Sequence, residues 1–293
     1  MNAGNVIRQS VKSQPWPSKS AVLEYCAVWT SGVSLDQRSI RIADGAAVAS
    51  ITSSLDPGSR ATGQPERLAK NLGMVFNGQY IMGIGFTAPV EFAKGLIQSD
   101  PRNSEVLFPY LSGQDVNSRA DSSASRWVIN FHDWSEARAS TYPECFNHVN
   151  LEVKPDRLRQ KDEYGKRYWW QFFRRRPELQ KAAHGLKQVI VMTLHTKTVM
   201  PVVVSTGQVF SHALGVFATD DTAMLALLSS APHYWWAKSR GSSMKTDLRY
   251  TPSDVFETFP LPELTGEMCE LGDRLDTFRR VHSRVRLSWA VAS

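Results

Sequence analysis

The sequence predicts a mixed α/β (α+β) fold with a helical appendage at the C-terminal end. Runs rich in β-branched residues at 189–194, 199–204 and 209–217 are typical of strands. Apolar residues three and four positions apart, as at 90–97, indicate helices in the same part of the chain. The last segment, 264–289, carries an apolar stripe with helical spacing. With 42% hydrophobic residues among 293, the chain can form a packed core.

Short apolar runs in the N-terminal part predict strands at the edge of a sheet. They lie at 22–29, 40–42 and 46–51. A stretch rich in Ser, Gly and Pro follows at 53–64 and is typical of a linker. We therefore expect a first domain over residues 1–64.

Glycines between apolar residues at 71–86 predict a strand pair with tight turns. Thr87 is then expected to cap a short helix with Pro89 in its first turn, and Asp100 with the following proline to end it. A compact strand is predicted at 127–131.

Helices are predicted at 134–142, from Pro177 to about residue 186, and from two aspartates at 220 and 221 to residue 228. Three prolines make 250–263 extended or turning. These elements form the second predicted domain, residues 65–262.

Residues 263–293 form the third predicted domain, a helix with an apolar stripe on one face and charged residues on the other. Such a helix is expected to dock its apolar face on another element. A partner helix in the same polypeptide is the expected site, and a homotypic coiled coil is the alternative. Two glycines, Gly266 and Gly272, weaken its first half. The apolar stripe consists of Leu264, Met268, Leu271, Leu275, Phe278, Val281, Val285 and Trp289.

Composition excludes several classes of protein. Three widely spaced cysteines argue against a disulfide scaffold or a cysteine zinc site. The longest stretch without charged residues, 198–219, is broken by proline and glycine, so no membrane span is expected. The N-terminal apolar run is interrupted by Glu24, which argues against a signal peptide. We therefore expect a soluble cytoplasmic protein.

Positive charge is concentrated in residues 154–176. The segment holds nine basic and three acidic residues, a net +6 that equals the formal net charge of the whole chain. Aromatic residues are interleaved with the charges, and arginine, which binds phosphate in bidentate fashion, outnumbers lysine. The segment therefore predicts contact with a polyanion, the alternative being a solvated surface without a partner. The predicted phosphate contacts are Lys154, Arg157, Arg159, Lys166, Arg167, Arg174, Arg175 and Arg176.

A metal-dependent nuclease is an alternative reading of part of this region. Glu152 and Lys154 form an E-x-K triplet, with Asp133 nineteen residues before Glu152. Two carboxylates and a lysine can hold Mg²⁺ and orient a water for phosphodiester hydrolysis. Such a triplet belongs on a buried strand, whereas here it precedes Pro155 and a predicted loop.

About two hundred residues carry a series of motifs whose order and spacing match those of a known family. They are Asn71-Leu72-Gly73, Gly83-Ile84-Gly85-Phe86, Arg126-Trp127-Val128-Ile129-Asn130-Phe131, Trp169-Trp170-x-Phe172-x-Arg174-Arg175-Arg176-Pro177, Ser229-Ser230-x-x-His233-x-x-Trp236-Ala237 and Arg249-Tyr250-Thr251-Pro252. With them, the chain resembles the C-terminal part of fused bacterial adenine-N6 DNA methyltransferases, the MmeI-like type IIL restriction-modification enzymes. The resemblance implies a target recognition domain that selects the methylated sequence in double-stranded DNA. Residues 1–64 resemble, more faintly, the end of a methyltransferase domain.

The chain departs from that family in its catalytic motifs. It contains no Pro-Pro dipeptide, so the Asn-Pro-Pro-Tyr/Phe motif that holds the flipped adenine is absent. The S-adenosylmethionine loop is also absent. We therefore expect no catalytic residue, no metal site and no cofactor in this chain, which resembles a piece such as a split specificity subunit or a truncated gene product. S-adenosylmethionine is expected only in a methyltransferase catalytic partner.

Under this resemblance, polar side chains between the late strands and the turn at Tyr250 are the expected base readers. Arg or Lys suits guanine, Asn or Gln suits adenine, and Asp or Glu suits cytosine. Two other readings stay open: a surface loop with incidental charges, and a structural role for Arg249 and Tyr250. A subunit that binds a methyltransferase chain through its last helix is a further alternative. The predicted base contacts are His195, Lys197, Lys238, Arg240, Ser242, Ser243, Lys245 and Arg249.

Overall fold

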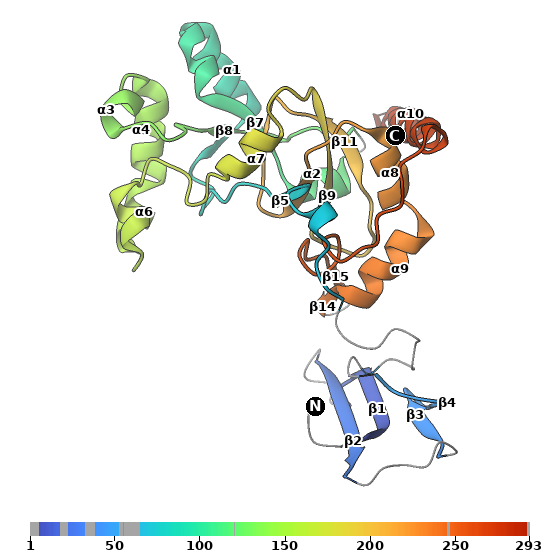
Figure 1. Cartoon of the computed structure of the whole chain (residues 1–293). Helices are drawn as coiled ribbons and strands as arrows, with labels where there is room; N and C mark the ends of the chain where they lie inside the picture. Colours follow the sequence, from blue (N-terminus) through green and yellow to red (C-terminus); the bar gives the residue numbers. More distant parts are fainter. Residues whose placement is uncertain are drawn as a thin grey trace. The chain divides into compact units, whose positions relative to one another are not determined.

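The computed structural model describes residues 6–17, 23–32, 39–52, 55, 65–119, 121–244 and 247–291. Side chains at 243, 244, 247 and 282–291 are outside this description. The chain divides into two compact units, Met1–Glu66 with Met244–Thr246, and Arg67–Ser243 with Asp247–Ser293 (Figure 1). The division near Glu66 lies two residues from the boundary that the sequence predicted, and the last helix belongs to the larger unit.

The smaller unit contains a four-stranded sheet in the order β2-β1-β3-β4. β1 (Val6–Pro15) pairs antiparallel with β2 (Glu24–Ser31) and parallel with β3 (Arg41–Ala43), which turns into β4 (Ala46–Val48). The three strands predicted from apolar runs are confirmed. β1 was missed because polar residues occupy most of its positions.

An antiparallel sheet lies at the centre of the larger unit, in the order β11-β9-β13-β5. β9 (Gln188–Thr193) and β13 (Leu214–Phe217) are its inner strands, and β11 (Val202–Ser205) and β5 (Val75–Asn77) are its edges. The inner strands are almost entirely buried, as their β-branched composition predicted. Separate apolar clusters contain residues that point to opposite faces of this sheet.

A second sheet has the order β12-β7-β8-β6. It consists of β12 (Val209–Phe210), β7 (Leu107–Leu111), β8 (Arg126–Ile129) and β6 (Thr87–Ala88). The single strand predicted at 209–217 is therefore two strands in two sheets. The break falls at Ser211, whose side chain and backbone make hydrogen bonds that turn the chain.

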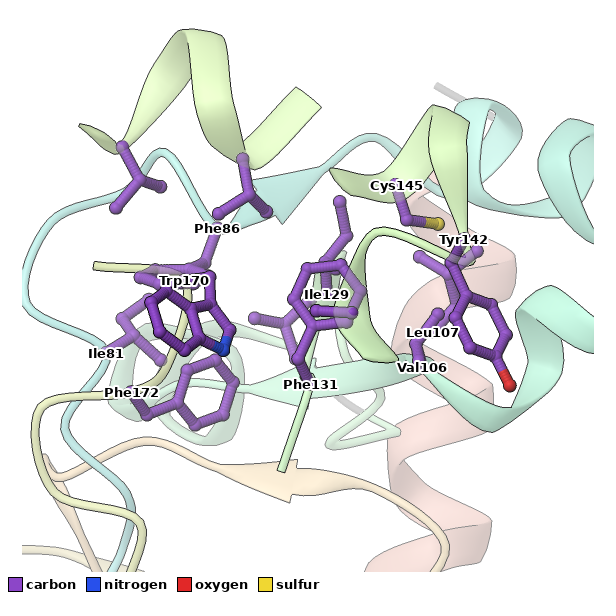
Figure 2. Close-up of a cluster of buried hydrophobic side chains, with 14 of the residues drawn as sticks. Ile81, Phe86, Val106, Leu107, Ile129, Phe131, Tyr142, Cys145, Trp170 and Phe172 are labelled. Atoms are coloured by element: carbon purple, nitrogen blue, oxygen red, sulfur yellow. The ribbon is translucent and has the colours of Figure 1, made fainter. Parts of the chain in front are cut away.

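A large apolar cluster lies between the second sheet and the neighbouring helices. It includes residues of α1 (Val90–Ser99) and α4 (Pro143–Glu152) together with the aromatic pair Trp169–Trp170. Figure 2 shows Phe86 and Phe172 meeting within it, with ring centroids 5.3 Å apart in an edge-to-face arrangement. Two short helices adjoin residues of this cluster in the sequence: α3 (Glu136–Ala139), which contributes Ala139, and η2 (Pro101–Glu105), which precedes Val106.

Two local predictions in this region were wrong. The strand pair expected at 71–86 is only β5, after η1 (Ala69–Asn71), because Gln79 and Tyr80 form isolated bridges with Ser211 and Arg174 in place of a second strand. Thr87 does not cap α1: it lies in β6 and donates to the carbonyl of Ile84, and Pro89 is the N-cap residue. The predicted end of α1 at Asp100 is confirmed.

The basic segment is helical where a loop was expected. α5 (Lys154–Arg159) follows α4 almost directly, and α6 (Glu163–Arg167) comes next. Pro155 is compatible with this because it occupies the first turn of α5, where its missing N–H has no intrahelical partner. The helix predicted at Pro177 is α7 (Pro177–Ala182), which ends four residues earlier than expected.

The remaining elements complete the larger unit. α2 (Gly113–Ser118) begins at a capping box formed by Ser112 and Asp115. α8 (Thr222–Leu228) is capped by Asp221 and α9 (Ala231–Arg240) by Ser230.

A small sheet in the order β10-β15-β14 joins β10 (His195–Thr196), β15 (Asp247–Arg249) and β14 (Ser242–Met244).

The C-terminal helix α10 (Gly266–Val291) packs on α8, so the prediction of a partner helix in the same polypeptide is confirmed. Gly272 is buried, and a Cβ there would overlap the carbonyl of Thr222. The apolar stripe divides: Leu264, Met268 and Leu275 join the core, while Leu271, Phe278 and Val281 are more than half exposed. The side chains of Val285 and Trp289 lie outside the described residues. None of the helices that the structure describes is both long and apolar enough to cross a bilayer.

Candidate nucleic-acid interface

β10 and β15 bring two of the predicted base readers face to face. His195 pairs with Arg249 and Thr196 with Leu248 in an antiparallel register. Directly opposed residues of such a pair project on the same side of the ribbon. His195, Arg249 and the neighbouring Lys197 are exposed. The ribbon therefore presents three polar side chains from distant parts of the sequence to solvent.

The C-terminal end of α9 lies against this ribbon. A Cβ at Gly241 would be 2.6 Å from a methyl of Leu248 and 3.0 Å from the carbonyl oxygen of Arg249, so only glycine allows this contact. The Nζ of Lys238 lies 5.3 Å from the centre of the Trp235 ring, and the guanidinium of Arg240 lies 5.0 Å from that of Trp236. α9 thus places two more predicted base readers beside β15.

Three other predicted base readers lie on β14 and just after it. Ser242 is exposed. The side chain of Ser243 and the whole of Lys245 lie outside the described residues.

A buried hydrogen-bonded pair holds the base of the ribbon. His233 Nδ1 lies 2.8 Å from the carbonyl oxygen of Leu228, and Nε2 lies 3.0 Å from the hydroxyl of Tyr250. Burial lowers the pKa of His233 to about 4, so the imidazole is neutral at physiological pH. Nδ1 then donates to Leu228, and Nε2 accepts from Tyr250. Because Tyr250 follows β15 directly, this pair ties the ribbon to α8 and α9, which supports a structural role for Tyr250.

Arg157 is in the interior, so its assignment as a phosphate contact was wrong. Only 1% of its surface is exposed. Its Nη2 donates to the carbonyl oxygens of Ile81 at 2.9 Å and of Gln171 at 3.3 Å, and its guanidinium lies between the rings of Phe86 and Phe173. The aromatic residues around the basic segment form a core that encloses this arginine.

Four other cations of the segment interact with their own neighbours. Arg159 pairs with Asp156 at 3.5 Å, and Lys166 with Glu163 at 2.7 Å. Exposed pairs of this kind are weak and leave the cation available to a polyanion. The other two cations are over aromatic rings: Lys154 over Trp169 and Arg167 over Tyr168.

The last three arginines form a separate group beside residues 79 and 80. Arg174 is exposed, and its backbone forms two 3.0 Å hydrogen bonds with Tyr80 in an antiparallel bridge. Arg175 lies 4.0 Å from Asp133, and Arg176 lies 3.6 Å from Glu178. This group is therefore held by backbone contacts, while its side chains reach the surface.

Tyr80 and His212 connect the arginine group to the ribbon. Their ring centroids are 4.6 Å apart. The backbone amide of Leu194 donates to the carbonyl oxygen of Ala213 at 2.9 Å, so the neighbouring residues His195 and His212 lie on adjoining segments. Burial lowers the pKa of His212, and the charge of His195 lowers it further. Arg174, Tyr80, His212 and His195 therefore form a row that links the predicted phosphate contacts with the predicted base contacts. The sequence did not single out Tyr80 or His212, because neither lies near these contacts along the chain.

An open cleft of about 630 Å³ lies beside the row, also unforeseen from the sequence. Tyr80 and His212 line one part of it, and Arg119 and Arg126 another. Residues 81–84, α2 and the start of β8 complete its walls.

The alternative nuclease arrangement finds no support in the geometry. Glu152 ends α4 and Lys154 begins α5, so the triplet lies between two helices and not on a buried strand. Asp133 is exposed near Arg175. Within the described part of the chain, no group of three or more His, Cys, Asp or Glu side chains is placed to hold a metal ion.

Comparison with known families decides the identity of the larger unit. The family described as "MmeI, target recognition domain" matches residues 65–263. The chain belongs to this family.

The target recognition domain accounts for more than half of the chain, and its limits enclose the row and the cleft. Among solved structures, the chain is similar to the type IIL restriction-modification enzyme MmeI in complex with DNA, with a TM-score of 0.70 and 14% identity. The similarity covers 91% of this chain and 37% of the MmeI chain, so this chain spans well under half of that enzyme. No curated protein matches the chain. The mixed α/β fold predicted from the sequence is confirmed.

Proposed function

We propose that this chain is the sequence-specific double-stranded DNA recognition module of a restriction-modification system, and that it directs an adenine methyltransferase to its site. One observation carries the proposal: the row from Arg174 through Tyr80 and His212 to His195 joins an arginine group to an exposed polar ribbon. Sequence-specific DNA binding needs both kinds of surface at a fixed separation, because phosphate contacts position the protein and base contacts specify the sequence.

The two groups of side chains have different tasks. Lys154, Arg159, Lys166 and Arg167 supply a diffuse positive field, and the arginines at 174–176 contact phosphates directly. Arg249 and Arg240 suit the bidentate acceptor pattern of guanine in the major groove. His195, Lys197, Lys238, Ser242, Ser243 and Lys245 complete the proposed reading surface.

Catalysis belongs to another domain or subunit in this proposal. The chain contains no Pro-Pro dipeptide and hence no adenine-binding Asn-Pro-Pro-Tyr/Phe motif. Its partner is therefore a methyltransferase catalytic domain or subunit, which binds S-adenosylmethionine. The smaller unit is the expected end of that catalytic domain.

Selection of bound sequences from random duplex DNA, at two salt concentrations, tests the proposal. A motif that remains enriched at the higher salt is the expected result, because base contacts do not depend on counterion release. Salt-sensitive binding without enrichment would overturn sequence recognition by this chain alone and leave only phosphate contact.

Substitutions separate the two tasks once a motif is known. Arg174→Ala should weaken binding to all duplexes equally and lower the salt slope by about one. Arg240→Ala or Lys245→Ala should relax the base choice at one position by roughly 1–3 kcal/mol. Affinities measured for the motif and its single-base variants show whether a substitution weakens binding to all duplexes or changes the preference at one position. Uniform weakening by both kinds of variant would contradict this division of tasks.

The last helix favours a second role that is compatible with the first. Leu271 is 55% exposed and Val281 52%, although other stripe residues of the same helix are in the core. We propose that this face binds the methyltransferase chain. Leu271→Ser with Val281→Ser should abolish co-purification with that chain while DNA affinity stays unchanged. Retained co-purification would exclude this face.

A further inference from the structure

The segment at 81–85 presents an apolar side chain to solvent on a rigid backbone. Ile84 is 76% exposed, so most of its aliphatic side chain contacts solvent. Its carbonyl oxygen accepts hydrogen bonds from both the amide and the hydroxyl of Thr87, at 2.8 and 2.7 Å. Met82 and Gly83 have positive φ, at 56° and 101°. The tip therefore has a fixed, tightly turned conformation.

Contacts from beneath hold the same segment. The buried guanidinium of Arg157 donates to the carbonyl oxygen of Ile81 and lies 3.4 Å from the sulfur of Met82. Gly85 packs on α4, where a Cβ would come within 2.5 Å of the carbonyl oxygen of Glu152. Arg157 forms no salt bridge with any residue in the described ranges, so its positive charge lies directly under the segment.

Cations line the cleft that this segment borders. Arg119 and Arg126 are exposed, and Arg126 forms no salt bridge within the described part of the chain. The guanidinium of Arg119 is held by the hydroxyl of Ser123 at 2.9 and 3.0 Å. Asp121 lies 3.7 Å from the guanidinium of Arg119, at an exposed position. Asp115, the one acid among the described wall residues, accepts hydrogen bonds from the amide and hydroxyl of Ser112. Two arginines and one carboxylate leave the described wall with a formal charge of +1.

We propose that Ile84 is an apolar wedge that enters a groove of duplex DNA, while Arg119 and Arg126 hold the phosphates on the other side of the cleft. A rigid aliphatic tip next to paired cations matches the arrangement by which proteins insert apolar side chains between base steps. The cleft is continuous with the row at Tyr80 and His212, so the wedge lies beside the surface that reads the sequence. This inference rests on the proposed DNA-binding function.

The test compares DNA affinity and its salt dependence for single variants of the full chain. Ile84→Ala should weaken binding about tenfold or more while leaving the salt slope unchanged, since an apolar contact releases no counterions. Arg126→Ala and Arg119→Ala should weaken binding and each lower the slope by about one. Ile40→Ala, in the smaller unit and also 76% exposed, and Arg102→Ala, whose side chain is paired with Asp100, are matched controls that should leave both quantities unchanged.

The wedge itself is observed with 2-aminopurine placed at successive positions of the duplex. The wild-type chain should raise its fluorescence at one base step by unstacking, and Ile84→Ala should remove that rise. Unchanged affinity with Ile84→Ala, or a fluorescence rise that this variant retains, would overturn the proposal. Failure of the wild-type chain to bind any duplex would instead refute the proposed function on which the inference rests.

Discussion

At the scale of single residues, Arg157 shows how a cation in a basic segment can be structural. It lies in the interior and bonds two backbone carbonyls, whereas Arg159, two residues away, has a side chain 79% exposed. Arg157→Met keeps the volume but leaves both carbonyls without a donor, which should cost about 3 kcal/mol of unfolding free energy. Arg159→Met should change it by less than about 0.5 kcal/mol. Urea unfolding of both variants checks this, and equal stabilities would contradict it.

The buried His233 makes stability depend on pH. Its pKa is about 4 in the folded chain and 6.5 in the unfolded chain, so the unfolded state binds a proton that the folded state excludes between these values. Stability should therefore be complete above pH 6.5 and fall as the pH drops towards 4. The loss attributable to this group is about 3 kcal/mol. Unfolding at pH 7.0 and 5.0 should show about 2 kcal/mol of this loss, and His233→Gln should remove that part of the slope. A slope that His233→Gln leaves intact would assign the effect to other groups.

At the scale of elements, two glycines inside helices differ in the space around them, so the same substitution to alanine should have opposite effects on stability. Gly272 in α10 lies against the carbonyl of Thr222 in α8, whereas a Cβ on Gly95 in α1 would meet nothing within 4 Å. Gly95→Ala should stabilise the chain by up to about 1 kcal/mol through helix propensity. Gly272→Ala should destabilise it by about 2 kcal/mol because the helices must separate. Thermal unfolding distinguishes stabilisation from destabilisation. Stabilisation by both substitutions would show that α10 does not pack closely on α8.

The elements also show how far the sequence alone predicts this fold. β9 and β13 follow from β-branched runs, and the starts of α7 and α8 from Pro177 and Asp221. The polar strand β1 could not be predicted, because only pairing with β2 and β3 stabilises it. Likewise, most candidate readers were identified by residue type, but the Tyr80–His212 contact arises from tertiary packing that no local pattern records. The burial of Arg157 contradicts the usual exposure of arginine, so composition could not reveal it.

At the scale of the whole molecule, the two units differ in the size of their cores. Among the described residues of the smaller unit, the buried apolar side chains are Ile7, Val11 and Ala43, whereas the larger unit has three extensive clusters. So small a core supplies little stability. Amide hydrogens of β1 should therefore exchange much faster than those of β9 in the intact chain. Mass spectrometry after exchange in D₂O measures this, and comparable protection would contradict it.

The row from Arg174 to His195 has a consequence for where a target lies on the duplex. Its length is fixed, because the steps are a backbone bridge, a ring contact and the backbone hydrogen bond from Leu194 to Ala213. Each DNA strand repeats its phosphates about every 3.4 Å along the axis. Under the proposed function, a fixed length corresponds to a fixed number of base pairs between the phosphate that Arg174 would hold and the bases that would lie opposite His195. An insertion beside Tyr80 would change that offset. The same side chains would then face bases at a different number of base pairs from the contacted phosphate.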